Sequence, residues 1–256
     1  MGYPTPLDPV VRVLNESTTT VSVPFSRVGL FEIGGRETVI GLDSTSVAVI
    51  APVPFTNESE DVVAGREVKY LIAPDFEHHM ALKSWKEKYP SSKVIGVQGL
   101  KERKKSDGVE VNYEISIANK CLTPTEAGIP DPLLDQAFQL IYLPAHTNKE
   151  LILYHLPTKS LIEADLLFNL PAHEQYSNTK ISNTGILSRI FNGAFNPSNH
   201  WHARAVSATL KDSPELRDAL KSIYGWDFET IIPCHGDVIT SDAKDIFHKV
   251  FTKFLQ

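Results

Sequence analysis

Cysteine is scarce in this sequence, whose 256 residues contain only Cys121 and Cys234. Two thiols cannot build the disulfide framework that stabilises many secreted proteins, and such scarcity is typical of a reducing compartment. We therefore expect a cytoplasmic protein. We also expect Cys234 to be a small buried core residue rather than a metal ligand, because alternation along a strand would point it away from the neighbouring His235.

Long hydrophobic runs and an excess of positive charge are also missing. No stretch of about 18 apolar residues occurs, so no segment is predicted to span a membrane. The stretch MGYPTPLDP lacks the apolar core of a secretory signal. Acidic residues (31) outnumber basic ones (25), for a net charge of −6. We therefore expect neither nucleic acid nor a membrane as partner. A small-molecule substrate is expected, and the oligomeric state stays open.

The first half of the sequence contains alternating or β-branched runs that predict short strands. They lie within residues 18–25, 34–43, 44–55, 66–74 and 93–99. Between the last two, residues 77–89 show a helical pattern, with Met80, Trp85 and Tyr89 on its buried side. A strand, a helix and a strand in succession indicate a βαβ unit.

The second half continues with strands and ends in helices. Strands are predicted within residues 109–117, 135–146, 150–157, 159–168 and 228–237. Residues 182–225 look helical or irregular. A C-terminal helix over 241–255 is expected to bury Phe247, Val250, Phe251 and Phe254. No repeat or linker divides the chain, so we expect a single domain over residues 1–256, in which helices cover layers of sheet.

Side chains that can bind a metal follow the ends of four predicted strands. They are His78 and His79 in DFEHH, His146 in LPAHT, Asp165 in EADLLF and His235 in PCHGD. Strand ends are rigid, and the loops beyond them leave room for a substrate. Histidine nitrogen and carboxylate oxygen suit zinc, iron or manganese. We therefore expect a metal site that binds zinc, or iron or manganese instead.

Each of these positions also has an ordinary structural explanation. His78 and His79 would suit a solvated helix start, Asp165 a cap or turn, and His146 a turn after a proline. We favour the metal site because several strand ends carry such residues at once.

The remaining histidines and tryptophans lack a metal-binding pattern. His155, His173 and His248 have no suitably spaced partner, and His200 and His202 would lie about 200° apart on a helix, so we expect both at the surface or rim. The tryptophans, Trp85, Trp201 and Trp226, are expected in the core. Asp237 is expected to orient a ligand histidine, and residues 169–199 to line the entrance.

The motifs, taken in order, resemble those of the metallo-β-lactamase superfamily. That family has an HxHxDH loop after a strand, a histidine in a PGHT-like turn, an aspartate in a GDxLF-like turn and a last histidine before glycine. LPAHT (143–147), EADLLF (163–168) and PCHGD (233–237) match the last three elements. The resemblance implies an α/β fold, a four-layer αββα sandwich with the metal at one edge of its two sheets.

The first motif departs from that pattern, because PDFEHH (74–79) stands where HxHxDH is expected. In the register that we prefer, His78 takes the place of the aspartate and only His79 matches in kind. A register shifted by one offers Asp75 and Glu77 as substitute ligands, similar to the mixed sites of the iron-containing flavodiiron branch. The arrangement resembles a divergent branch of the superfamily that contains domains of unknown function.

The resemblance implies a metal-dependent hydrolase. Its metal ligands would be His78, His79, His146, Asp165 and His235, and they would hold one or two Zn²⁺ ions, or Fe or Mn instead. Asp165 and His146 would be its catalytic residues, and its substrate a small ester, lactone or thioester attacked by a metal-activated water. Two alternatives stay open: a non-catalytic protein of this fold with a degraded site, and an iron-dependent redox or lyase enzyme.

Overall fold

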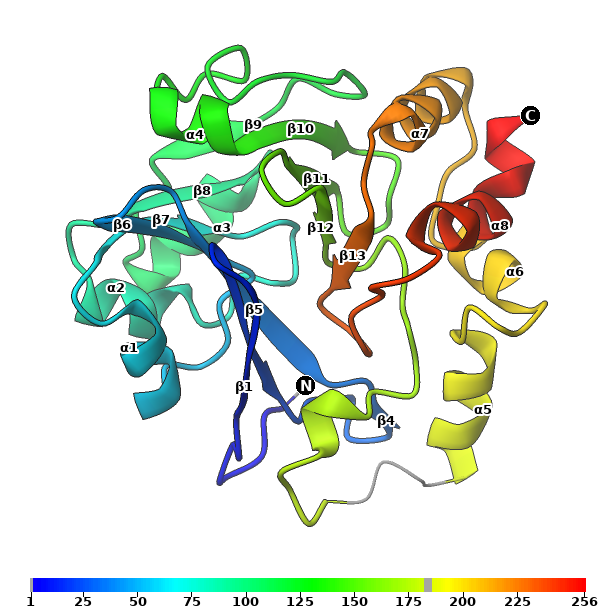
Figure 1. Cartoon of the computed structure of the whole chain (residues 1–256), viewed down its shortest axis with the longest axis horizontal. Coiled ribbons are helices and arrows are strands. Elements are labelled where there is room, and N and C mark those ends of the chain that lie inside the picture. The colour runs from blue at the N-terminus through cyan, green and yellow to red at the C-terminus, as the bar shows by residue number, and fades with distance from the viewer. Residues whose placement is uncertain (1, 182–185) are drawn as a thin grey trace.

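The computed structural model of the chain describes residues 2–181 and 186–256. Its strands form two main sheets in the middle of the molecule (Figure 1). The larger sheet has seven strands, in the order β1 (Val10–Asn15), β2 (Thr18–Val23), β5 (Gly35–Gly41), β6 (Ser46–Ile50), β7 (Glu67–Ile72), β8 (Lys93–Val97) and β9 (Tyr113–Ile115). Neighbours from β1 to β6 run antiparallel, and those from β6 to β9 run parallel.

The second sheet has four strands. Their order is β10 (Phe138–Leu143), β11 (Glu150–His155), β12 (Ser160–Glu163) and β13 (Thr230–Pro233). The pairs β10–β11 and β11–β12 are antiparallel, whereas β12 and β13 are parallel. The carboxyl ends of β12 and β13 therefore lie at the same edge of the sheet. A separate short ribbon is formed by β3 (Ser26–Arg27) and β4 (Phe31–Glu32).

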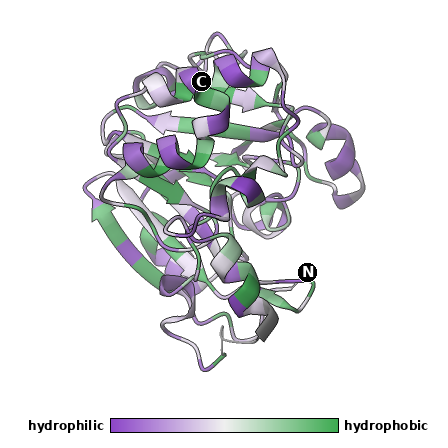
Figure 2. Cartoon of the chain, turned by 90° about the vertical axis from the view of Figure 1, so that its right-hand side faces the viewer, coloured by the Kyte–Doolittle hydropathy of each residue, from purple (hydrophilic) through white to green (hydrophobic). Residues whose placement is uncertain are grey.

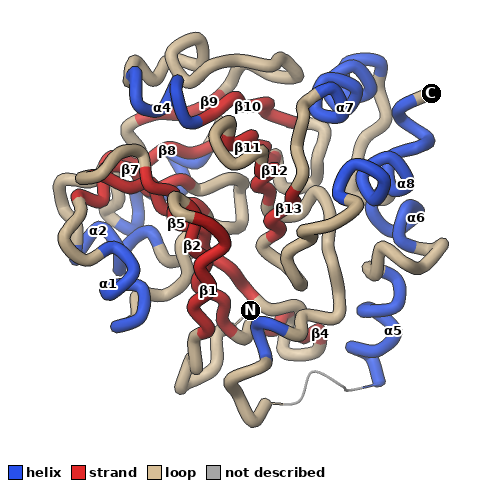
Figure 3. The backbone as a smooth tube through the Cα atoms, in the orientation of Figure 1, coloured by secondary structure: helices blue, strands red, loops and turns tan. Residues whose placement is uncertain are grey.

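Helices cover the outer face of each sheet (Figure 3). On the larger sheet lie α1 (Asn57–Val63), α2 (Leu82–Lys88) and α3 (Leu100–Lys104), and on the second sheet lie α6 (His202–Ser207), α7 (Pro214–Gly225) and α8 (Ala243–Leu255). The other helical segments are η1 (Lys105–Asp107), α4 (Pro132–Ala137), η2 (Glu174–Tyr176) and α5 (Ile186–Ala194). The predicted four-layer αββα sandwich is confirmed.

Strand alternation explains why the larger sheet is covered on both faces. On β6, Val47 and Val49 pack with the outer helices, whereas Ala48 and Ile50 pack in the layer between the sheets. Successive strand residues point to opposite faces, so a run of apolar residues buries both. Trp85 of α2 is fully buried on the outer face, and its indole N–H donates to the carbonyl of Val53 at 2.8 Å.

The C-terminal helix is as predicted, since Phe247, Val250, Phe251 and Phe254 of α8 are all buried. The helices carry both hydrophobic and hydrophilic residues (Figure 2), as expected of amphipathic helices that pack one side on a sheet. The helix predicted over residues 77–89 is shorter than expected, because α2 begins at Leu82. Met80 lies in the preceding turn and is 41% exposed, so its predicted burial is wrong.

Two further predictions are corrected by the structure. Trp201 is 49% exposed rather than part of the core, and the Arg204 guanidinium stacks on its ring at 5.1 Å. His202, expected at the surface or rim, is buried beside Phe195. Both differences arise because α6 begins at His202 and turns that residue inward. Among the described residues, no helix is both long enough and apolar enough to cross a membrane.

Candidate metal centre

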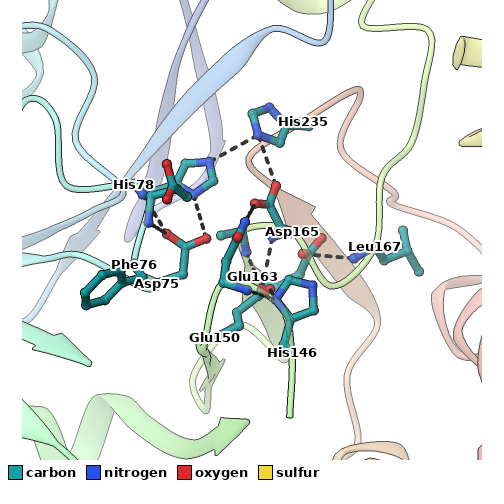
Figure 4. A network of polar contacts seen from close by, with 12 residues as sticks. Asp75, Phe76, His78, His146, Glu150, Glu163, Asp165, Leu167 and His235 are labelled. Atoms are coloured by element: carbon teal, nitrogen blue, oxygen red, sulfur yellow. Dashed lines mark hydrogen bonds and ion pairs between the residues drawn. The ribbon is translucent and has the colours of Figure 1, made fainter. Parts of the chain in front are cut away.

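Three of the predicted metal-binding side chains meet at one edge of the two sheets. His78 follows β7, Asp165 follows β12 and His235 follows β13. One ligand-type atom from each lies within 4.8 Å of the others, and Figure 4 shows the three side chains turned toward one another. The meeting follows from topology, because the carboxyl ends of parallel strands are the usual place for ligands in α/β proteins.

Asp75 fixes the orientation of His78. The Asp75 carboxylate is fully buried and accepts the backbone N–H groups of Glu77 at 2.8 Å and His78 at 2.6 Å. Its second oxygen lies 2.8 Å from Nδ1 of His78. A carboxylate behind a histidine is the usual arrangement for metal-binding imidazoles. The contact turns Nε2 of His78 toward the centre.

His235 is held by a carbonyl instead of a carboxylate. Its Nδ1 donates to the backbone oxygen of Gly34 at 2.6 Å. Its Nε2 lies 3.1 Å from Nε2 of His78 and 3.2 Å from Oδ1 of Asp165. The next residue, Gly236, has a φ of +92°, and a Cβ there would lie 2.0 Å from the Asn169 oxygen. Only glycine fits this turn, so the turn fixes the position of His235.

The three central atoms form a set of electron-pair donors. The Nδ1 atoms of His78 and His235 both face oxygens that can only accept a hydrogen bond, so each neutral ring presents a lone pair at Nε2. Those lone pairs point at each other and at an oxygen of Asp165. Such an arrangement requires positive charge between the three atoms, supplied either by a proton on His78 or by a bound cation. The donor set fits zinc, iron or manganese.

The titration behaviour of the site agrees with this geometry. Burial lowers the pKa of His78, but the carboxylates of Asp75 and Asp165 outweigh burial and raise it to about 10. Burial raises the pKa of Asp165, yet His78 and His235 hold it well below its usual range. The carboxylates therefore make the centre favourable for a cation.

His79 does not join this group. Its ring is buried, and neither ring nitrogen has a hydrogen-bond partner among the described residues. Burial, together with Lys104 and Arg103, lowers the pKa of His79 to about 4. Adjacent residues in the turn project in different directions, and the hydrogen bonds of Asp75 select His78. Both adjacent histidines were predicted as ligands, and the structure brings His78 to the centre and leaves His79 outside it.

His146 lies near the centre but outside the group of three. It is buried, and its Nδ1 lies 3.3 Å from Oε2 of Glu150. Its Nε2 has no hydrogen-bond partner in the described part of the chain. Burial lowers the pKa of His146. The neighbouring Asn148 amide donates to Oδ2 of Asp165 at 2.5 Å, so this turn contacts the centre through Asn148.

Two buried carboxyl groups support the turn that carries Asp165. Glu150 accepts the backbone N–H of Ala164 at 2.8 Å and of Asp165 at 3.1 Å. Glu163 accepts the N–H of Leu167 at 3.1 Å. Burial raises the pKa of both Glu150 and Glu163 well above the usual value. The sequence analysis missed both residues; the only signal was an acidic residue at the edge of each apolar strand.

Arg36 supports the loop of His235. The guanidinium is buried and donates to the carbonyls of Pro233 at 2.7 Å and Gly236 at 2.6 Å. It also forms an ion pair with Glu174 at 3.0 Å. Asp237, expected to orient a ligand histidine, instead contacts His173 at 2.7 Å and the N–H of Glu174 at 2.9 Å. The role predicted for Asp237, to orient a ligand histidine, is filled by Asp75 and the Gly34 carbonyl instead.

Two hollows meet at Asp165. One is lined by His78 and His235 together with residues such as Tyr3 and Phe25. The other is a cleft lined by His146 and Asn148 and by apolar residues that include Phe191 and Phe195. The two phenylalanines belong to the segment 169–199, so its described part lines the cleft as expected.

We compared the sequence and the structure with those of known proteins. No protein-family model matches the sequence, and no curated protein matches it. Solved structures do match. A metallo-β-lactamase from Hirschia baltica matches at 9% identity with a TM-score of 0.59, over 96% of this chain and 97% of that one. One from Pontibacter korlensis matches at 8% identity with a TM-score of 0.57, over 96% of this chain and 98% of that one. A mutant flavo-diiron protein from Thermotoga maritima matches at 9% identity with a TM-score of 0.65, over 97% of this chain and 63% of that one. The chain therefore has the metallo-β-lactamase fold.

Proposed function

We propose that this chain is a metal-dependent hydrolase that acts on the carbonyl of a small ester, lactone or thioester, with zinc as its ion. The supporting observation is the convergence of His78, Asp165 and His235. Catalytic zinc sites bind three protein ligands and leave a further position open, and this set supplies three. The fold shared with metallo-β-lactamases is consistent with the proposal.

The residues of the site divide the chemistry between them. When bound, a zinc ion would supply Lewis acidity and bring the pKa of a water molecule to about 7. Asp165 faces the histidines with Oδ1 and accepts the Asn148 amide with Oδ2, so its carboxylate is held in one orientation. That carboxylate can orient the attacking water.

His146 is the residue placed to move a proton. Attack forms a carbon–oxygen bond, cleavage releases an alkoxide or thiolate, and the proton lost by the water ends on that leaving group. Nε2 of His146 is free of partners in the described chain, and the residue lines the same cleft as Asp165. Its lowered pKa leaves the ring neutral at pH 7, which suits acceptance and return of a proton.

The charges around the site favour a carbonyl substrate over a phosphorylated one. Besides Asp165, the only charged residue that lines the cleft within the described chain is Arg27. A polyanionic substrate needs several cations or metal ions around its phosphoryl oxygens. One arginine at the mouth supplies too little positive charge for that chemistry.

Elemental analysis tests the metal, and a substrate panel tests the reaction. Protein purified without added metal is expected to contain about one zinc per chain, and His78→Ala and His235→Ala are expected to lose it. Chromogenic esters, lactones and phosphodiesters then separate the reaction classes. Stoichiometric iron would direct the assignment to redox or lyase chemistry. Absence of any bound metal after purification and after zinc supply would refute the proposal and leave the non-catalytic alternative.

A further inference from the structure

The two hollows that meet at Asp165 differ greatly in size. The one beside His78 and His235 has a volume of about 30 Å³. A water molecule needs roughly 10–15 Å³ on this measure, so the narrow hollow accepts about two waters. The cleft beside His146 has a volume of about 460 Å³, within the range of about 300–1,000 Å³ that small-molecule sites occupy. Of these two hollows, therefore, only the cleft can hold the bulk of a substrate.

One wall of the cleft is a continuous row of aromatic rings. Phe31 of β4 lies 4.8 Å from Phe191 of α5, measured between ring centroids. Phe191 lies 4.5 Å from Phe195, which lies 4.8 Å from Phe168. Phe168 in turn lies 5.2 Å from the imidazole of His235. The row thus runs without a break from the outer part of the cleft to a side chain of the metal centre.

The other residues that line the cleft are mostly small or uncharged. They include Ala205 of α6, Ala208 just past its end, Thr147 and Thr209. Arg27 is exposed and has no ion pair among the described residues. Few groups here can bind a polar or charged ligand along its length. Burial of hydrocarbon is the main favourable term that such walls supply.

We propose that this cleft binds the hydrocarbon chain of the substrate, and that the substrate class is esters or thioesters of medium-chain acyl groups. This inference rests on the proposed function. The carbonyl would lie at the Asp165 end, and the chain would extend past Phe195 and Phe191. Water replaces the alcohol or thiol on the carbonyl carbon, so one carboxylic acid and one alcohol or thiol leave.

A binding experiment tests the cleft without any need for turnover. The neutral dye N-phenyl-1-naphthylamine is titrated into the protein as purified and into chelator-treated protein, with its fluorescence as the readout. Octanamide, which resembles the acyl half of the substrate, is then added as competitor. We expect octanamide to displace the dye from both samples, and acetamide to leave it bound.

Variants connect this binding to the cleft. Ala208→Phe fills part of the cleft, and Phe191→Ala removes part of its aromatic wall. Each is expected to weaken octanamide binding by about tenfold or more, because a buried methylene contributes about a factor of four. Ile190→Ala is the matched control, since Ile190 lies next to Phe191 on α5 but is 68% exposed and does not line the cleft. Its affinity should stay within about twofold of the parent protein.

Hydrolysis of p-nitrophenyl esters extends the test to catalysis. We expect kcat/KM to rise by about a hundredfold or more from acetate to octanoate. Ala208→Phe should remove most of that rise, whereas Ile190→Ala should keep both the rise and the rate with acetate. If the amide binds and no ester is hydrolysed, the proposed function fails but the chain-binding cleft stands. The inference is overturned if octanamide fails to displace the dye from the parent protein. It is also overturned if octanamide binds both cleft variants as tightly as it binds the parent, whatever the hydrolysis shows.

Discussion

Nε2 of His78 lies 3.1 Å from Nε2 of His235, although 157 positions separate the two residues in the sequence. Hydrogen bonds on the far side of each ring hold the two Nε2 atoms in this opposition, so the contact is imposed by the surrounding protein. Positive charge between the rings makes the contact favourable: a proton on His78 supplies it without metal, because the neighbouring carboxylates raise the pKa of His78 to about 10, and a bound cation would take the place of that proton. The stability of the fold should therefore depend on metal.

Removal of metal is expected to lower the melting temperature. An ion present at about 100 times its Kd contributes about 2.7 kcal/mol, which corresponds to about 5–10 °C for a chain of this size. Differential scanning fluorimetry with a chelator, followed by added zinc, measures the change. His235→Ala should be insensitive to the chelator, whereas the exposed His200→Ala should respond like the parent protein. An equal response in His235→Ala would show that the metal binds elsewhere.

Asp75 is expected to control metal affinity without being a ligand. Asp75→Asn removes the negative charge behind His78, and loss of such a group typically weakens metal binding by about 10–100-fold. Competition with a chromophoric zinc chelator measures the affinity. Asp43→Asn is the matched control, because Asp43 also accepts two backbone N–H groups, those of Thr45 at 2.8 Å and Ser46 at 2.7 Å, but is remote from the centre. Equal affinities for both variants would contradict this role.

Gly236→Ala is expected to damage both stability and the site. The added Cβ would lie 2.0 Å from the Asn169 oxygen at a φ of +92°, so the turn beside His235 must move. A strained backbone of this kind costs about 1–3 kcal/mol, before the steric overlap is counted. Gly225→Ala, with no atom within 4 Å of its Cβ, should be neutral or slightly stabilising. Urea unfolding compares the two; parent-like stability in Gly236→Ala would refute the steric argument.

His155 is expected to make the protein less stable in mild acid. Burial lowers its pKa to about 4, whereas an unfolded histidine has a pKa of about 6.5. As the pH falls, the unfolded state takes up a proton on this residue before the folded state does. The neutral His155 ring therefore contributes its full stabilisation of the folded state above about pH 6.5, and that stabilisation is lost as the pH falls toward 4. The loss reaches up to about 3 kcal/mol.

Unfolding measured across this pH range, in the presence of a chelator, checks that expectation. His155→Gln should reduce the slope of the unfolding free energy against pH. His248→Gln, at an exposed position on α8, should keep the parent slope. An unchanged slope in His155→Gln would assign the pH dependence to other buried groups.

The layers of the fold could be predicted because alternation and apolar runs record which strand faces are buried. The strand-end positions of His78, Asp165 and His235 could be found for the same reason. The choice between two adjacent histidines could not, since it depends on hydrogen bonds to Asp75 that periodicity does not encode. The burial of Arg36 could not be predicted either, because its carbonyl partners lie 197 and 200 residues away in the sequence.

The span of the Arg36 contacts has a consequence for how the protein matures. The Arg36 guanidinium lies on β5 of the larger sheet. It donates hydrogen bonds to the turn that carries His235, which lies near the other end of the chain. A nascent polypeptide on the ribosome contains His78 and Asp165 long before these hydrogen bonds can form. Under the proposed function, the three residues could therefore bind a metal ion together only after synthesis of β13 is complete.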